Sequence, residues 1–239
     1  MPDQVVFWDI DGTLIDGSLE RCFLAYLRRH GHATIPYLAR SAARLTLDWP
    51  PGWHKIKIAY LRGRAVEEVE QLLESCWADS ILPDISSAAA ATVLDLRERG
   101  ARQILLSGTP RPLAMKMASY LRIADVIAAD PEIRNGIYTG RLTARHPRGI
   151  RKVQYAQKWL NENGCTWGMT TGIADHWDDR FLLGRVHNAI AVAPGKRLRR
   201  LASSQGWVIQ NMRDDLRSQI PVITASWNAA QSGSRPKAG

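Results

Sequence analysis

The sequence predicts an α/β protein whose parallel sheet is flanked by helices and carries a helical insertion after its first strand. An apolar run near the N-terminus is typical of a buried strand, and predicted strands and helices alternate regularly from Pro83 onward. Between these two regions, Gly31 to Leu82 shows helical patterns and no convincing strand. A chain of 239 residues is long enough for one core with an insertion.

The first predicted strand, Val5 to Trp8, ends in a pair of carboxylates. Asp9 and Asp11 follow it, and Gly12 then allows the chain to turn. Open α/β sheets bind ligands at this carboxyl edge. The two carboxylates can do different jobs where the backbone kinks, as Gly12 allows just after them. A capping aspartate followed by an Asp-Gly turn explains the motif equally well when it stands alone.

The predicted insertion begins with an amphipathic helix. Apolar residues at helical spacing predict that this helix starts near Ser18. These residues are Leu19, Phe23, Tyr26 and Leu27. The helical pattern that follows is broken at residues 48–53. We expect the tryptophans of this segment, Trp49, Trp53 and Trp77, to pack its own helices rather than to contact a ligand.

After Pro83 the predicted elements follow in βαβ order. They are a helix ending at Gly100, a strand at 103–106, a helix at 110–121, a strand near 125–127, a helix at about 152–160, a strand at 167–173, a short helix after Asp175, a strand at 189–192, a basic helix and a strand at 207–209. Asn135-Gly136 predicts a hairpin turn. The pattern fades beyond Arg213, which predicts a mobile tail.

Composition narrows the classes of function. The chain has 45% hydrophobic and 23% charged residues, as expected of a folded globular protein. It has no transmembrane-length apolar run and no secretory signal pattern, so we expect a soluble cytoplasmic protein. Cys22, Cys76 and Cys165 have no paired spacing and are expected to be reduced packing thiols. The net charge of +9 suits an anionic partner, but without a nucleic-acid motif we expect no nucleic-acid binding.

Three further polar signals fall where a parallel sheet would bring them beside Asp9 and Asp11. The first is Ser107-Gly108-Thr109, which lies between a strand and a helix that opens with proline. The Ser107 hydroxyl can donate a hydrogen bond to a phosphoryl oxygen, and the amides after it can face an anion. Capping of the helix by Thr109 is the simpler interpretation of that residue alone.

The second signal is Lys152, at the start of a helix, where lysines usually face water. The third is Asp175, with Asp178 and Asp179 close behind it, again directly after a predicted buried strand. Helix capping explains one of these acids, but all three repel one another unless a cation lies among them. Carboxylates, a backbone carbonyl and water are the ligands that suit Mg²⁺.

Taken in order, these motifs resemble those of haloacid dehalogenase superfamily phosphatases, in the phosphoserine-phosphatase-like branch (subfamily IB) with a helical cap of the C1 type. The motifs are Asp9-Ile10-Asp11-Gly12-Thr13, Ser107-Gly108-Thr109, Lys152, and Asp175 through Asp179. The resemblance covers Val5 to Ile209 and extends to the flap-like segment 135–140. It implies a Rossmann-like core at 1–16 and 83–212, a helical cap at 17–82 and a tail at 213–239.

The resemblance implies a role for each motif. Asp9 would attack phosphorus and form an aspartyl phosphate, while Asp11 would protonate the leaving oxygen and then activate water. Ser107 and Lys152 would hold the phosphoryl oxygens. The implied Mg²⁺ ligands are Asp9, Asp175 and the Asp11 carbonyl, and Asp179 would orient the metal's surroundings or Lys152. The implied substrate-binding residues are Asp9, Ser18, Ser107, Gly108, Thr109 and Lys152.

The chain departs from this branch at two places. Ala174-Asp175-His176 stands where family members usually carry Gly-Asp-Ser or Gly-Asp-Gly, and His176 either contacts substrate or is an exposed residue at a helix start. Phosphoserine phosphatases place a substrate-reading glutamate nine residues after the nucleophile, where this chain has Ser18. Glu20 does not fill that position, so we do not expect phosphoserine as the substrate. Basic residues of the insertion either attract a second anionic group or face solvent; they are His54, Lys55, Lys57, Arg62 and Arg64.

The sequence therefore predicts a Mg²⁺-dependent phosphomonoester hydrolase that acts on a small phosphorylated metabolite through an aspartyl phosphate. Two alternatives stay open. One is a phosphotransferase that passes the phosphoryl group from Asp9 to an alcohol. The other is a phospho-aspartate signalling module such as a receiver domain, which carries its nucleophile alone on a later strand and has no helical insertion. The presence of Asp11 favours turnover over a long-lived phosphate.

Overall fold

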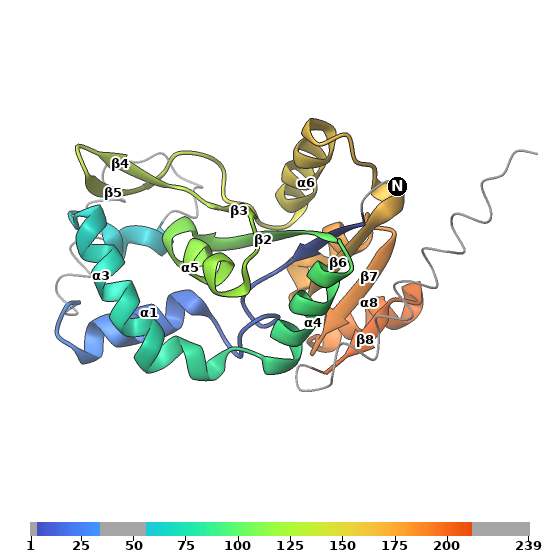
Figure 1. Cartoon of the computed structure of the whole chain (residues 1–239), viewed down its shortest axis with the longest axis horizontal. Helices are drawn as coiled ribbons and strands as arrows, with labels where there is room; N and C mark the ends of the chain where they lie inside the picture. The colour runs from blue at the N-terminus through green and yellow to red at the C-terminus, as the bar shows by residue number, and fades with distance from the viewer. Residues whose placement is uncertain (1–3, 34–55, 212–239) are drawn as a thin grey trace, which may run out of the picture.

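The computed structural model describes residues 4–33 and 56–211, and its centre is a six-stranded parallel sheet (Figure 1). The strands lie in the order β3-β2-β1-β6-β7-β8. Their bounds are β1 Val5–Trp8, β2 Arg102–Pro110, β3 Asp125–Ala129, β6 Thr170–Ala174, β7 Asn188–Val192 and β8 Val208–Gln210. β1 pairs with β2 on one side and with β6 on the other, so the first strand is central.

Helices cover both faces of the sheet (Figure 1). The longer ones beyond the insertion are α4 Ser87–Glu98, α5 Arg111–Leu121, α6 Ile150–Glu162 and α8 Lys196–Gln205, with a short α7 Arg180–Leu183. The alternation along β1 divides the core in two. Val5 and Phe7 pack with α6 residues such as Trp159, while Val6 and Trp8 join a larger cluster on the other face. The predicted α/β class is confirmed.

The described part of the insertion is helical. It contains α1 Leu19–Arg29, the 3₁₀ helix η1 Ile56–Leu61, α3 Val66–Cys76, the π-helical turn η2 Trp77–Ile81 and the 3₁₀ turn η3 Leu82–Asp84. Its apolar side chains belong to the same cluster as Trp8 and Ile10 of the sheet region. Trp77 is buried against Tyr120 of α5, with ring centroids 5.6 Å apart, so this tryptophan has a packing role as predicted, although its ring partner lies outside the insertion.

Several predictions fall outside the described residues. They concern Trp49, Trp53, His54, Lys55, the side chain of Lys57 and the tail at 213–239. The division into a core at 1–16 and 83–212 and a cap at 17–82 stays a prediction.

A β-hairpin joins the insertion to the rest of the molecule. Its strands, β4 Pro131–Arg134 and β5 Ile137–Leu142, are antiparallel and connected by Asn135-Gly136, which confirms the predicted turn. Backbone hydrogen bonds link the hairpin to the segment before α3: Gly63 N–H donates to Tyr138 O at 2.8 Å, Tyr138 N–H donates to Arg64 O at 2.9 Å, and Val66 N–H donates to Gly136 O at 3.0 Å.

Three local predictions are wrong. β2 runs on through Pro110, so Ser107 to Thr109 lie in the strand, and Pro110 rather than Thr109 occupies the N-cap position of α5. Trp167–Met169 form a 3₁₀ turn instead of opening a strand, because the Thr170 hydroxyl donates to Trp167 O at 2.8 Å and closes the turn. The last strand begins at Val208, one residue later than predicted.

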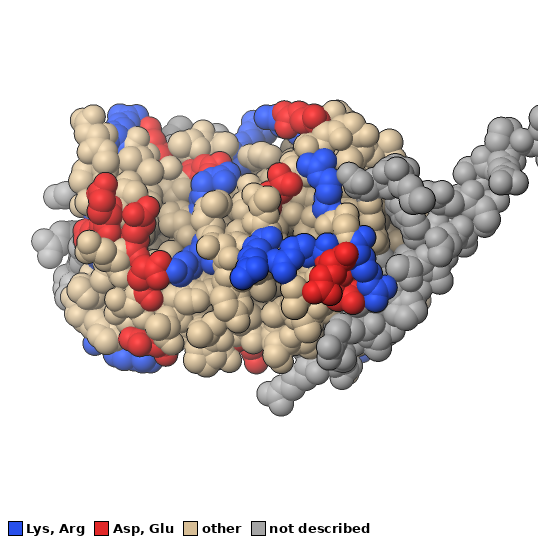
Figure 2. All heavy atoms as spheres, in the orientation of Figure 1, with Lys and Arg blue, Asp and Glu red and all other residues tan. Residues whose placement is uncertain are grey.

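The face of the molecule in Figure 2 carries both signs of charge. Acidic side chains gather over α3, and basic side chains lie towards α4 and α5. Cys22, Cys76 and Cys165 are free thiols. Among the residues that the structure describes, no helix combines the length and the hydropathy needed to cross a membrane.

Candidate active site

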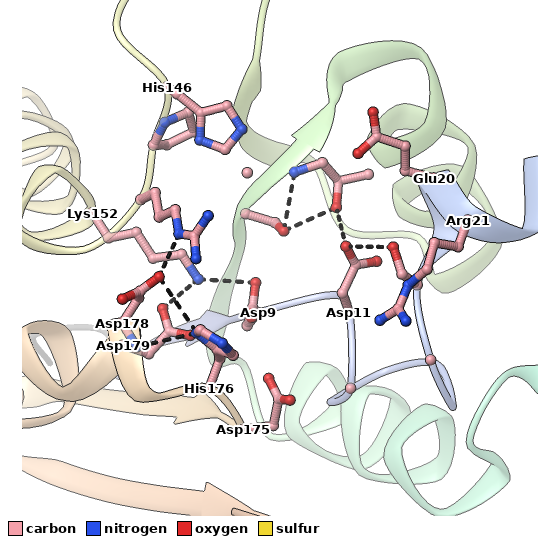
Figure 3. A pocket seen from close by; sticks show the side chains of 18 of the residues that line it. Asp9, Asp11, Glu20, Arg21, His146, Lys152, Asp175, His176, Asp178 and Asp179 are labelled. Carbon is pink, nitrogen blue, oxygen red and sulfur yellow. Dashed lines mark hydrogen bonds and ion pairs between the residues drawn. The ribbon is translucent and has the colours of Figure 1, made fainter. Parts of the chain in front are cut away.

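The carboxyl ends of β1, β2 and β6 open into a cavity of about 720 Å³ (Figure 3). Asp9 and Asp175 directly follow β1 and β6, Ser107 lies in the last part of β2, and the start of α6 adds Lys152. The other polar side chains that line the cavity are Asp11, Ser18, Glu20, Arg21, Tyr60, Thr109, His146, Arg148, His176, Asp178 and Asp179. The structure therefore brings all four sequence motifs together, as the parallel sheet predicted.

Lys152 is the centre of a buried charge cluster. Its Nζ lies 2.9 Å from Asp9 Oδ1 and 2.5 Å from Asp179 Oδ1. The three residues are 3%, 7% and 2% exposed, respectively. Burial alone would lower the pKa of Lys152, but the charges of Asp179 and Asp9 raise it well above its ordinary value. This lysine therefore stays protonated and holds Asp9 in place, unlike the exposed lysines common at helix starts.

Asp11 is held by different partners from Asp9. Its carboxylate accepts hydrogen bonds from Leu19 N–H at 2.9 Å, from Ser18 Oγ at 3.1 Å and from Thr109 Oγ1 at 3.4 Å. Burial, followed by the charge of Asp9, raises its pKa above the ordinary value despite these hydrogen bonds. A raised pKa suits Asp11 to the role of a general acid, which must carry a proton before the reaction.

Ser18 occupies the N-cap position of α1 but makes no side-chain cap hydrogen bond. Its hydroxyl donates to Asp11 instead, so the structure shows it orienting an acid. Its predicted contact with substrate stays a prediction.

The Ser107-Gly108-Thr109 segment presents two hydroxyl groups at the cavity. Ser107 Oγ lies 3.0 Å from Thr109 Oγ1 and accepts a hydrogen bond from Thr109 N–H at 3.3 Å. A β-carbon built on Gly108 would lie 2.3 Å from His146 Cε1, so only glycine fits while the histidine ring stays where it is. The segment is suited to receive an anion between its hydroxyls and Lys152.

Three carboxylates form a candidate metal centre. Oxygens of Asp9, Asp175 and Asp179 lie within 4.8 Å of one another. Asp175 Oδ1 is buried and accepts no hydrogen bond from another residue among those described. Burial, followed by the charges of Asp9 and Asp179, raises the pKa of Asp175 to about 7. Burial also raises the pKa of Asp179 to about 6, although Lys152 opposes the shift.

This donor set fits a divalent cation. All its ligand atoms are oxygens, and a cation would offset the repulsion that raises these pKa values. Gly12 allows the close approach of Asp175, because its φ is +73° and a β-carbon there would lie 2.2 Å from Asp175 Oδ2. The Asp11 carboxylate lies outside the cluster, and the predicted ligation through its carbonyl stays a prediction.

The remaining acid after β6, Asp178, lies outside the candidate metal centre and pairs with basic side chains. Asp178 pairs with Arg148 and lies 3.5 Å from His176 Nδ1. Burial would raise the pKa of Asp178, but hydrogen bonding and charge from Arg148 lower it overall. His176 accepts a hydrogen bond from Asp178 N–H at 3.2 Å, which gives this departure from the family pattern a local structural role.

Several lining residues have no signal in the sequence. Tyr60 is buried, and burial together with the charge and hydrogen bond of Glu20 raises its pKa well above the ordinary value. His146 and Arg148 come from the loop before α6, where no motif marks them.

Of the two arginines of the insertion for which a role was predicted, Arg64 differs from the prediction. Arg64 is buried, donates to Tyr60 O at 3.2 Å and pairs with Glu68, so it neither faces solvent nor lines the cavity. Its guanidinium is held against η1 by this hydrogen bond to the Tyr60 carbonyl. Arg62 lines a separate pocket of about 370 Å³ beside the β4–β5 hairpin.

Comparison with known proteins identifies the family. Residues 6–183 match the haloacid dehalogenase-like hydrolase family, which is most of the chain. The chain belongs to this family. Phosphoserine phosphatase SerB1 of Mycobacterium tuberculosis is 28% identical over 217 residues, covering 87% of this chain and 70% of the relative. Histidinol-phosphatase of Neisseria meningitidis is 24% identical over 220 residues, covering 88% of this chain and 99% of the relative.

A solved structure shares the fold. The phospho-aspartyl intermediate analogue of a phosphoserine phosphatase is 17% identical and superposes with a TM-score of 0.65, covering 93% of this chain and 99% of that one. These findings confirm the predicted family, its phosphoserine-phosphatase-like branch and an enzyme of the hydrolase class.

Proposed function

We propose that this protein is a Mg²⁺-dependent phosphomonoesterase that hydrolyses a small phosphorylated metabolite through a phosphoryl group on Asp9. One observation carries the proposal: two carboxyls that stand two residues apart at one strand end are held by different partners. Asp9 contacts the Lys152 ammonium at 2.9 Å, which places a positive charge beside the attacking oxygen. Asp11 has a raised pKa, which favours its protonated form.

The first step uses both carboxyls. An Asp9 oxygen forms a bond to phosphorus while the bond from phosphorus to the ester oxygen breaks. Asp11 gives its proton to that departing oxygen, so the alcohol leaves uncharged. Ser107 and Lys152 bind the phosphoryl oxygens, with the Gly108 and Thr109 amides beside them.

The second step returns the enzyme to its starting state. Asp11, now ionised, takes a proton from a water molecule whose oxygen attacks phosphorus. The bond between phosphorus and Asp9 breaks, which releases inorganic phosphate and restores the Asp9 carboxylate.

The acidic cluster described above would hold the metal. Asp9, Asp175 and Asp179 would surround Mg²⁺, with the Asp11 carbonyl as the predicted further ligand. When bound, Mg²⁺ supplies positive charge that offsets the repulsion among phosphoryl and carboxylate oxygens.

The relatives named above are consistent with a monoester of a small alcohol, since one is a phosphoserine phosphatase and the other a histidinol-phosphatase. The cavity of about 720 Å³ can hold a molecule of that size. Its cap-side wall carries both signs of charge through Glu20 and Arg21.

A phosphate-release screen over phosphorylated metabolites tests the proposal. We expect release that needs Mg²⁺ and is lost in Asp9→Asn, while Asp16→Asn, an exposed acid nearby, keeps its activity. Unchanged turnover in Asp9→Asn would contradict the proposal. Added alcohols separate the alternatives, because a phosphotransferase would form new esters and a hydrolase would still yield mostly inorganic phosphate.

A further inference from the structure

The loop between β5 and α6 forms a wall of the cavity that none of the four motifs includes. It faces Glu20 and Arg21 of α1 across the cavity (Figure 3). The loop contributes His146, Pro147 and Arg148 to the lining. A lining element with no assigned role, this close to the Ser107-Gly108-Thr109 segment, is a candidate for substrate recognition.

Contacts on both sides of His146 fix this loop. The Tyr155 hydroxyl donates to Arg145 O at 2.5 Å, and Arg148 pairs with Asp178 on the loop after β6. Pro147 is buried, and Arg148 N–H donates to His146 O at 2.9 Å. The backbone of His146 is therefore held before any ligand arrives, which reduces the entropy lost on binding.

The imidazole ring of His146 points into the cavity (Figure 3) and lies against Gly108. A β-carbon built on Gly108 would meet Cε1 at 2.3 Å and both ring nitrogens at 3.2 Å. The ring therefore presents its Cε1 edge to Gly108, with one nitrogen on each side of that edge. An anion bound by Ser107 and the Gly108 amide would lie within reach of a ring nitrogen.

We propose that His146 is a further ligand of the substrate's phosphoryl group, donating a hydrogen bond from an imidazole N–H to a phosphoryl oxygen. The inference rests on the proposed function, since it assumes that the cavity takes a phosphate ester. A dianionic phosphoryl group favours a protonated imidazole, and charge-assisted hydrogen bonds of this kind are stronger than neutral ones. His146 thus adds a donor to those of Ser107, Gly108 and Lys152.

The test compares variants by equilibrium binding of inorganic phosphate in the presence of Mg²⁺, and by KM and kcat. We expect His146→Ala to weaken phosphate binding about tenfold, the loss of one charge-assisted hydrogen bond, with an unchanged melting temperature. His146→Gln retains an N–H donor and should recover part of the affinity. His187→Ala removes an exposed histidine outside the cavity and should match the wild type.

Two results would overturn the inference: His146→Ala that binds phosphate as tightly as the wild type, or His146→Gln that binds no better than His146→Ala. If His146→Ala does not fold, His146→Leu, which also lacks a side-chain donor, replaces it in both comparisons. A wild type that binds phosphate but hydrolyses no ester would refute the proposed function alone, because the binding comparison needs no turnover.

Discussion

Replacing Lys152 by methionine removes the positive charge at the centre of the buried cluster while nearly keeping the side-chain volume. Its Nζ lies 2.9 Å from Asp9 and 2.5 Å from Asp179, and both carboxylates are almost fully buried. Leaving buried charges without their partner typically costs about 3–5 kcal/mol. Since proteins of this kind are stable by roughly 5–15 kcal/mol, Lys152→Met should lose a large share of its free energy of unfolding.

Urea denaturation in the presence of a chelator measures this loss. Lys158→Met is the matched control on the same helix: its side chain is 73% exposed and its ammonium lies 3.7 Å from Glu162, so removing this charge should change the stability by less than about 0.5 kcal/mol. Mg²⁺ should restore part of the stability of Lys152→Met, because a cation among the carboxylates replaces some of the lost charge. A loss below about 1 kcal/mol without metal would refute the view that Lys152 neutralises this cluster.

Three further predictions concern the same site. Gly12→Ala should abolish Mg²⁺-dependent activity, because its β-carbon would lie 2.2 Å from Asp175 Oδ2. Gly31 has a similar φ with open space around it, so Gly31→Ala should lose only stability. Equal activity in the two variants would contradict the predicted clash with Asp175. The pKa of Asp175 is raised to about 7, so its protonation stabilises the metal-free fold at low pH, and this contribution is lost as pH rises through 7. Mg²⁺ should therefore raise the melting temperature more at pH 8 than at pH 5. Equal increases at the two pH values would argue against metal binding at Asp175. Asp11→Asn should slow release of inorganic phosphate by about a hundredfold or more through loss of the general acid and base, and near wild-type release would contradict that role.

The sheet and the gathering of the motifs could be predicted from the sequence because both depend on local pattern. Apolar strands followed by polar residues place those residues at the same edge once the strands run parallel. Asp9 and Asp175 follow such strands and Ser107 lies near the end of one, and the structure brings them to one cavity with Lys152 from the start of α6.

The errors came from individual side-chain contacts that a pattern of residue types does not reveal. Trp167 suits a strand by composition, but the hydrogen bond from Thr170 to its carbonyl closes a turn. Ser18 has the sequence position of a helix cap, yet Asp11 lies close enough to take its hydroxyl. Arg64 belongs to a basic stretch that predicts an exposed side chain or an anion contact, but folding places it under η1 against Glu68.

His146 shows the same limit at the site itself. Nothing in its sequence neighbourhood marks it, because its position over Gly108 depends on the pairing of Arg148 with Asp178, thirty residues further along the chain.

Chemical trapping of the phosphorylated enzyme tests the central proposal most directly. After rapid mixing of Asp11→Asn with substrate and Mg²⁺ and quenching in acid, mass spectrometry of the peptides should find one added phosphoryl group on the peptide that contains Asp9. The group should be absent when Asp9 is also replaced by asparagine. Turnover by the wild type, with no phosphoryl group on Asp9 in either protein or with one on another residue, would contradict the account.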